Sequence, residues 1–448
     1  MGSAEPRIEI LIVGAGLAGL FCALECKRRG FAPIVLESRD VVQSVGDFIT
    51  IGPTAIRAFK NWPTLYDAFH KAAYDTNVYY HKQHGEVGAG PRKVNESFGW
   101  NIIRPDLHKM LMDTVLANGI GVRYLQHVVE FLETPDKGGV KLSDGEILYA
   151  DLVIAADGIR SKSWMVVTGE EPKTYSSGSA IFRCAYPTSH AMTIPSLREN
   201  WDTSTHGETM HFFLGSVSHG IMLIGKEKTC WGWMHRDDET TSVESWSAKL
   251  SSETALQQLD GDGEWSPEYR AVVDATPPNS IIHWRLVWRD LHKDWVSPKG
   301  RVVQIGDAAH AFLPTSVNGG TQAFEDAVSL PCCLRMAIDQ KGLDGIPTAT
   351  KVHNTLRLDR VSFIQQLGFK RRNAYYNLDW EAVKKDPSLV ASEPAKWQYE
   401  HDPEKYAATR FEECRNCLET GKAFKNTNVP EHYTFEPWTV KDMEAGTK

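Results

Sequence analysis

The sequence predicts an α/β fold in which a parallel sheet is interrupted by an antiparallel sheet and followed by a helical C-terminal region. Three short apolar runs, beginning near residues 8, 151 and 301, each end in a turn that contains glycine, as strands of a buried parallel sheet do. Between residues 173 and 284, short runs rich in aromatic and branched residues predict antiparallel strands. From about residue 350 onward the sequence predicts helix, with apolar residues at helical spacing over Thr355 to Arg372 and a looser tail after it.

The first motif lies in the stretch IEILIVGAGLAGL. Ile8 to Val13 is a nearly continuous apolar run, which predicts a buried strand, and Gly14, Gly16 and Gly19 follow at GxGxxG spacing. Gly14 permits a tight turn, Gly16 lets the backbone approach a pyrophosphate, and Gly19 lets a helix pack closely on the strand. This spacing predicts a dinucleotide site, but it does not distinguish FAD from NAD.

The residues after these glycines complete a strand–helix–strand unit. Leu17 to Arg29 is predicted to form a helix whose free N–H groups and partial positive charge face the phosphates. A second strand, Pro33 to Leu36, ends at Glu37, whose carboxylate can accept hydrogen bonds from ribose hydroxyls.

Two further stretches place polar residues at strand ends. In ADLVIAADGIRSKSW, the predicted strand Asp151 to Ala156 runs directly into Asp157. In GRVVQIGDAAHAFLP, the predicted strand Arg301 to Ile305 is followed by Asp307, at the carboxyl end where ligands bind in open α/β sheets.

The glycines at 319 and 320 open another predicted helix. Gly319 and Gly320 follow Asn318 and leave unhindered N–H groups at the helix N-terminus. Glu325 and Asp326 lie in its early turns, where helix polarity favours negative charge.

The order and spacing of the three stretches resemble the dinucleotide fingerprint, DG motif and GD motif of group A flavoprotein monooxygenases, the para-hydroxybenzoate hydroxylase-like family. The resemblance, closest to fungal natural-product oxygenases, implies a Rossmann-like (GR2-type) FAD-binding domain with an inserted antiparallel substrate sheet. It also implies tightly bound FAD, NAD(P)H as reductant, with NADPH favoured over NADH, and O₂ as co-substrate; the sequence leaves the choice between NADPH and NADH open. In such enzymes a C4a-hydroperoxyflavin transfers electrophilic oxygen to an electron-rich carbon of a small-molecule substrate.

The resemblance carries roles onto matching positions. It implies that Asp307 bonds the ribityl chain of FAD, and that Asp157 touches FAD and takes part in nicotinamide use. Arg104, just before a proline favoured at a helix start, is expected near the FAD phosphates and ribityl chain. The N–H groups of Gly319 and Gly320 are expected to stabilise negative charge on the N1–C2=O edge of reduced flavin.

Arg183 and Asp47 are the catalytic candidates. Arg183 lies in SAIFRCAYP, which resembles the first strand of the substrate domain in this family. The pKa of an arginine is too high for general acid catalysis, so Arg183 would orient the substrate or stabilise charge. The alternative is an ion-paired or surface arginine. Asp47 follows Gly46, where the family has small residues beside the cofactor; it could orient a substrate N–H or hydroxyl and pair with Arg183. The alternative is a cap for a helix around 53–60. Leu223 stands near the position where the family often has a tyrosine.

The motif positions predict three regions. They are a discontinuous FAD-binding domain (1–75, 100–172 and 285–345), a substrate-binding β-sheet domain (173–284 plus part of 76–99) and a helical C-terminal region (346–448). The expected strands of the insert are Ser179 to Tyr186, Met210 to Leu214, Gly220 to Ile224 and Thr229 to Met234, and a helical segment is expected over Val243 to Asp260.

Composition restricts the partners and location. The 448 residues carry a net charge of −8, which argues against a nucleic-acid binder. No apolar run reaches the roughly 18 residues of a membrane span, and the N-terminus leaves no room for a secretory signal, so a cytoplasmic location is expected.

The eight cysteines are expected to be free thiols, since Cys414-x-x-Cys417 has no partner pair, and no metal is expected. The oligomeric state stays open.

The expected reaction is hydroxylation or epoxidation of a bulky aromatic or indole-type secondary metabolite, as in alkaloid biosynthesis. A phenol or aromatic-acid hydroxylase of the salicylate hydroxylase type would share every FAD motif. A flavin-dependent halogenase needs a WxWxIP-type signature, and Cys230-Trp-Gly-Trp-Met lacks the Ile-Pro. A non-catalytic flavoprotein that acts as a redox sensor is the alternative of a different class.

Overall fold

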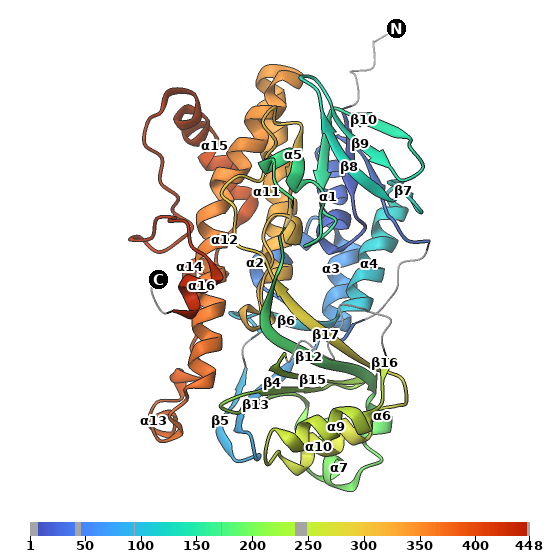
Figure 1. Ribbon diagram of the computed structural model, residues 1–448, viewed down its shortest axis with the longest axis vertical. Helices are drawn as coiled ribbons and strands as arrows, with labels where there is room; N and C mark the ends of the chain where they lie inside the picture. Colours follow the sequence, from blue (N-terminus) through green and yellow to red (C-terminus); the bar gives the residue numbers. More distant parts are fainter. Residues whose placement is uncertain (1–7, 41–45, 94, 172, 238–248, 446–448) are drawn as a thin grey trace.

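The computed structural model describes residues 8–40, 46–93, 95–171, 173–237 and 249–445. A five-stranded, all-parallel sheet lies toward one end of the molecule, in the order β18-β11-β1-β2-β7 (Figure 1). Its strands are β1 (Glu9–Val13), β2 (Ala32–Leu36), β7 (Gly121–Arg123), β11 (Leu152–Ala155) and β18 (Val302–Gln304). The predicted apolar runs therefore form adjacent strands, and their carboxyl ends share one edge.

Helices cover one face of this sheet and a small antiparallel sheet covers the other. The helices include α1 (Leu17–Arg28), α4 (Arg104–Ala117) and α11 (Gly319–Lys341), and their core contains the edge-to-face rings of Phe21, Phe59 and Phe324. The small sheet consists of β8 (Val128–Glu133), β9 (Gly138–Leu142) and β10 (Ile147–Ala150).

An eight-stranded sheet lies toward the opposite end, in the order β16-β17-β12-β15-β14-β13-β4-β5 (Figure 1). Its strands are β4 (Thr76–Lys82), β5 (Val87–Lys93), β12 (Tyr175–Pro187), β13 (Glu208–Leu214), β14 (His219–Ile224), β15 (Lys228–Arg236), β16 (Lys249–Leu250) and β17 (Ile281–Trp288). All four strands predicted in the insert are present. The helix predicted over Val243 to Asp260 is wrong in part: residues 243–248 lie outside the described residues, Lys249–Leu250 is strand, and α9 begins only at Ser252.

The two faces of the eight-stranded sheet differ. Phe182, Cys184 and Tyr186 of β12 point to the outer face, into a core shared with α7 (Pro195–Trp201), α9 (Ser252–Gly261) and α10 (Pro267–Asp274). Successive strand residues alternate between faces, so Ile181, Arg183 and Ala185 stand on the opposite, inner face. The inner face is turned toward the half of the molecule that holds the parallel sheet, since Ala185 packs against the cluster that contains Ile103.

The remaining elements lie around and between the two sheets. They are β3 (Phe48–Ile51), β6 (Trp100–Ile103), α2 (Pro53–Phe59), α3 (Pro63–Ala72), α5 (Trp164–Thr168), α6 (Thr188–Ala191), α8 (Thr203–His206), α12 (Ile346–Tyr376), α13 (Trp380–Lys385), α14 (Lys396–Tyr399), α15 (Pro403–Thr420) and α16 (Val440–Glu444). Short 3₁₀ turns occur at Gly306–Ala308, Pro314–Ser316, Gly342–Gly345 and Pro387–Leu389. Helix α12 runs along the long axis beside both halves (Figure 1).

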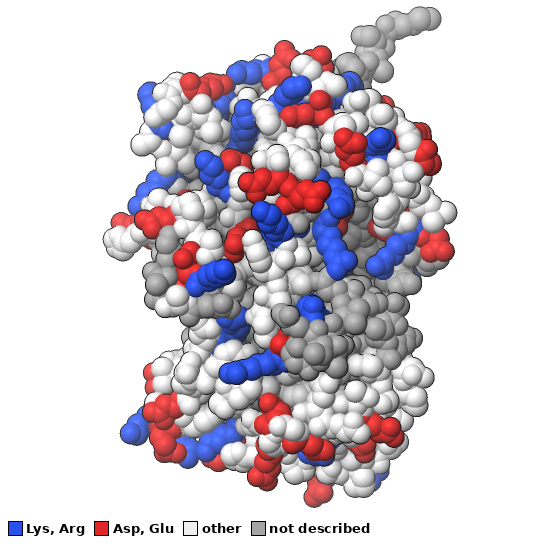
Figure 2. Space-filling model, viewed as in Figure 1, with Lys and Arg blue, Asp and Glu red and all other residues white. Residues whose placement is uncertain are grey.

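This architecture confirms the predicted fold class of α/β with an antiparallel insert and a helical C-terminal region. The domain boundaries stay a prediction. None of the helices within the described ranges is long and apolar enough to cross a membrane. All eight cysteines are free thiols. Basic and acidic side chains are interspersed over the face drawn in Figure 2.

Candidate active site

The three glycine motifs meet at the carboxyl ends of β1, β11 and β18. Gly14 has a φ of 103°, and a Cβ there would lie 2.5 Å from the carbonyl oxygen of Ala156, so only glycine fits between the first and second motifs. A Cβ on Gly306 would lie 3.1 Å from Cβ of Ala18 on α1, which brings the third motif to the same place. A Cβ at Gly16, by contrast, would meet nothing within 4 Å. The backbone at Gly16 therefore faces open space, where a diphosphate can approach.

Glu37 lies beside the start of α1, at the end of β2. Its Oε2 accepts a hydrogen bond from Ala15 N at 3.0 Å, and its Oε1 accepts one from Arg39 N at 3.0 Å. A Cβ on Gly19 would lie 2.0 Å from the carbonyl oxygen of Gly14, so α1 packs against the glycine turn as its spacing predicts. These contacts fix a carboxylate next to the free N–H groups of a helix, an arrangement that suits the ribose and phosphates of a dinucleotide.

The strand pair β3–β6 brings Asp47 and Arg104 together. Phe48 pairs with Ile103, and Arg104 N donates to the carbonyl oxygen of Asp47 at 2.9 Å. Gly46 has a φ of 141°, a conformation that favours glycine, and packs against the Arg104 side chain.

Arg183 reaches this place from the inner face of the eight-stranded sheet. Its guanidinium donates to the carboxylate of Asp47, which is 5% exposed. Burial and the neighbouring Arg183 lower the pKa of Arg104, while Asp307 and Asp47 raise it, so the four charges are within electrostatic reach of each other. Asp47 does not cap the following helix, since α2 begins after Gly52 and has no side-chain cap.

The third motif completes this group. Asp307 lies in the 3₁₀ turn after β18, and its side chain is exposed. A Cβ on Gly320 would lie 2.8 Å from Cδ1 of Ile49, so the N-terminus of α11 packs closely on β3. Gly319 lies directly before it, at the first turn of this 23-residue helix. The helix N-terminus and the Asp47 loop are therefore neighbours.

Arg289 is a residue that the sequence reasoning missed. It follows β17, is 5% exposed, and none of its three guanidinium nitrogens has a hydrogen-bond partner among the described residues. The guanidinium lies 4.5 Å above the ring of Trp164. Burial lowers the pKa of Arg289 to about 10, and burial raises that of Asp157 to about 6. The Oδ1 atom of Asp157 also lacks a partner within the described ranges. Buried polar atoms without partners are typical of a ligand site.

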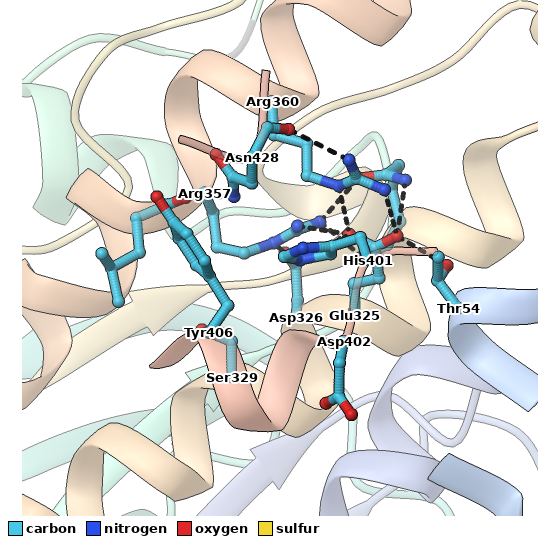
Figure 3. Close-up of polar contacts among 12 residues, drawn as sticks. Thr54, Glu325, Asp326, Ser329, Arg357, Arg360, His401, Asp402, Tyr406 and Asn428 are labelled. Carbon is cyan, nitrogen blue, oxygen red and sulfur yellow. Dashed lines mark hydrogen bonds and ion pairs between the residues drawn. The ribbon is translucent and has the colours of Figure 1, made fainter. Parts of the chain in front are cut away.

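A buried ion network lies directly behind this site (Figure 3). Arg357 binds Glu325 at 2.5 Å and Asp326 at 2.8 Å, and Arg360 binds Glu325 at 2.8 Å. All four side chains are 1% exposed or less. Burial alone would raise the pKa of Glu325, but Arg360 and Arg357 outweigh it and hold this pKa well below its usual range. Glu325 also accepts a 2.7 Å hydrogen bond from Thr54 on α2.

Asp326 connects this network to the third motif. Its Oδ2 accepts a hydrogen bond from Gly306 N at 2.9 Å and lies 2.6 Å from Nε2 of His310. The turn that carries Asp307 is therefore held from behind by α11 and α12. Helix polarity, which the sequence predicted for Glu325 and Asp326, is a minor part of their role, because their cationic partners come from another helix.

Fold and site together define a protein that binds a dinucleotide across a parallel sheet and faces it with a second, antiparallel sheet. Open backbone at Gly16, the Glu37 carboxylate, and buried polar atoms of Asp157 and Arg289 that have no partner among the described residues fit FAD. A family model described as "FAD binding domain" matches residues 7–350.

Known proteins agree with this assignment. A FAD-dependent monooxygenase of Claviceps purpurea (strain 20.1) is 36% identical over 472 residues, which cover 99% of this chain and 92% of that protein. The crystal structure of CtdE in complex with FAD and a substrate has a TM-score of 0.83 at 28% identity, covering 92% of this chain and 100% of that one. A salicylate hydroxylase substrate complex shares the fold, with a TM-score of 0.71 at 21% identity, 91% of this chain and 98% of that one. The chain belongs to the FAD-dependent monooxygenases, as its motifs predict.

Asp307→Ala is expected to reduce FAD retention, because Asp307 is the carboxylate assigned to the ribityl chain. The flavin-to-protein ratio of the purified variant measures this. Asp344→Ala, which removes an exposed aspartate from another 3₁₀ turn, is the matched control and should keep full flavin. Full occupancy in Asp307→Ala would remove the ribityl assignment.

Proposed function

We propose that this monooxygenase uses NADPH and O₂ to hydroxylate or epoxidise an electron-rich carbon of a bulky, neutral aromatic or indole-type secondary metabolite. The ion pair between Arg183 and Asp47 is the observation that carries this proposal. Because Asp47 already matches the charge of Arg183, the pair suits a neutral substrate better than a carboxylate. Each partner still offers a polar atom type that an indole or amide can use: N–H donors on Arg183 and carboxylate oxygens on Asp47.

The residues of the three motifs would bind the cofactor in the roles that the motifs imply. Bound FAD would supply the redox chemistry, accepting two electrons from NADPH and activating O₂. Arg289 would contact an anionic group on the Asp157 side, since a guanidinium buried without a partner is costly. The residues that would hold FAD are Gly14, Gly16, Gly19, Glu37, Gly46, Arg104, Asp157, Asp307, Gly319 and Gly320.

Arg183 and Asp47 would act on the substrate. A guanidinium held by an ion pair is already oriented, so its N–H groups would hold a polar group of the substrate, or stabilise the negative charge that electrophilic oxygen transfer leaves on the oxygen donor, without reorganising. Asp47 would accept a hydrogen bond from a substrate N–H or hydroxyl and so fix the ring for attack. The inner face around them is apolar, with Ile181 and Ile221 flanking Gly232 in the row of Arg183 and Leu223 further along β14, and would exclude water from the reacting atoms.

Anaerobic reduction tests the proposal. The yellow protein is mixed with NADPH, and flavin bleaching is followed alone and with indole alkaloids or phenolic acids. Bleaching that is many times faster with indole compounds, followed by an oxygenated product in air, is the expected result. Acceleration by salicylates or hydroxybenzoates instead would identify a phenol or aromatic-acid hydroxylase. No reduction with any compound would revive the redox-sensor alternative.

A further inference from the structure

His219 shares the inner face of the eight-stranded sheet with Arg183. Arg183 pairs with Gly232, and Gly232 pairs with Ile221 on β14, so these three residues occupy one row across the sheet. His219 lies two residues from Ile221 on the same strand and pairs with Met234. Directly paired residues share a face, as do residues two apart. Arg183 and His219 are thus two strands and two residues apart. At the usual strand spacing and rise per residue, their Cα atoms are separated by about 12 Å.

The imidazole of His219 is buried in an unusual way. It is 7% exposed, and neither ring nitrogen has a hydrogen-bond partner of ordinary geometry among the described residues. The ring stacks on Tyr376 at 4.5 Å and meets the edge of Tyr375 at 5.8 Å, both from the end of α12. Burial lowers the pKa of His219 to about 4, with the Ser218 backbone acting in the opposite direction, so the ring is neutral near pH 7.

A histidine on the opposite face shows what a structural role looks like. His211 is also fully buried in the same sheet, on the neighbouring strand β13. Its Nδ1 lies 3.0 Å from Nε2 of His81, and the other nitrogen of His81 lies 3.1 Å from the carbonyl oxygen of Gly85. Buried polar side chains usually have at least one such partner. His219 has a buried imidazole without this chain of contacts, on the face that also carries the catalytic candidate.

Side chains near His219 on the inner face keep accessible surface. Phe212 and Ile221 are half-buried although their face is turned toward the Asp47 loop, and Ile221 and Met234 lie between Arg183 and His219. Gly232 contributes no side chain in the row of Arg183. The face between Arg183 and His219 is therefore apolar, with a polar group at each end.

We propose that His219 is a specificity-determining residue, which hydrogen-bonds a polar group at the far end of a polycyclic substrate whose reacting ring lies beside Arg183. The proposal rests on the proposed function and deepens it. A neutral imidazole offers one donor and one acceptor, so it can bind a hydroxyl or an amide. A separation of about 12 Å between the two Cα positions suits a ligand of several rings better than a single-ring acid. The substrate class is thus a molecule of several rings with hydrogen-bonding groups at two ends.

His219→Phe tests this role, because it keeps an aromatic ring against Tyr376 and removes both nitrogens. The probes are cyclo(Trp-Ala) and 2,6-dihydroxyanthracene, with salicylate as the single-ring comparison. Binding is measured from the flavin absorbance change of oxidised holoenzyme, without reductant. The wild type should bind at least one of the larger probes more tightly than salicylate. His219→Phe should weaken that binding about tenfold, the effect of losing one buried hydrogen bond, with flavin content as the check on folding.

Two controls separate binding from folding. His211→Phe makes the same replacement on the outer face and should leave the dissociation constant unchanged; His219→Gln retains a neutral donor and acceptor and should restore part of the affinity. Unchanged binding in His219→Phe, equal weakening in His211→Phe, or no preference of the wild type for either larger probe would overturn the proposal. Binding with the expected pattern but no oxygenated product would instead contradict the proposed function alone.

Discussion

Glu325→Gln is expected to destabilise the fold by about 3–5 kcal/mol, because it removes the carboxylate that the buried Arg360 binds and one of the two carboxylates that the buried Arg357 binds. Glutamine keeps the shape and hydrogen-bonding oxygen of the side chain, so the loss measures charge and not packing. Denaturant unfolding of the variant and the wild type, both stripped of flavin, gives the free energy directly.

The control for this experiment is Glu381→Gln. Glu381 forms an exposed ion pair with Lys384 at 2.9 Å, one turn apart on α13. Exposed pairs contribute about 0–1 kcal/mol, so this variant should unfold close to the wild type. Equal stability of the two variants would mean that the network of α11 and α12 is not needed for folding.

Arg183→Gln is expected to uncouple NADPH oxidation from product formation. Glutamine carries no charge, so it can neither form the ion pair with Asp47 nor stabilise the negative charge left on the oxygen donor. Reduced flavin should still form, but oxygen should be released as hydrogen peroxide. The measurements are peroxide and product per NADPH consumed, with flavin content as the check on folding.

Arg285→Gln is the matched control for Arg183→Gln. Arg285 is also a half-buried arginine in an ion pair, with Asp237 at 2.7 Å, but it lies on β17 with Ala180 as its strand partner, on the outer face. Its variant should keep the wild-type ratio of product to peroxide. Unchanged product yield in Arg183→Gln would remove Arg183 from the catalytic candidates.

The cofactor half of the site was predictable because its demands are local. Tight turns and close backbone approaches select glycine at fixed spacing, so Gly14 and Gly320 could be found in the sequence before any tertiary contact was known. The strands of the insert were predictable for the same reason, from composition over five to eight residues. The parts that failed, such as residues 249–250, lie where short polar segments carry little periodicity.

The contacts between residues that are far apart in the sequence were not predictable in this way. Asp326 and Arg357 are 31 residues apart and meet only because α11 packs on α12. Arg289 carries no motif, and its isolation from hydrogen-bond partners is a property of the packed structure. Strand alternation places His219 on one face, but the sequence does not say which face of the sheet is turned inward.

Helix α12 makes the two halves of this enzyme hard to exchange. Near the start of α12, Thr350 donates a hydrogen bond to the carbonyl oxygen of Gly300, which lies just before β18. In the last turn of α12, Tyr376 stacks on His219. At 31 residues it is a rod of about 45 Å. A chimera that takes the inserted sheet from a relative without the matching end of α12 would pack a foreign sheet against the native Tyr375 and Tyr376. Evolution or engineering of new substrate range in this scaffold is therefore expected to change the insert and the end of α12 together.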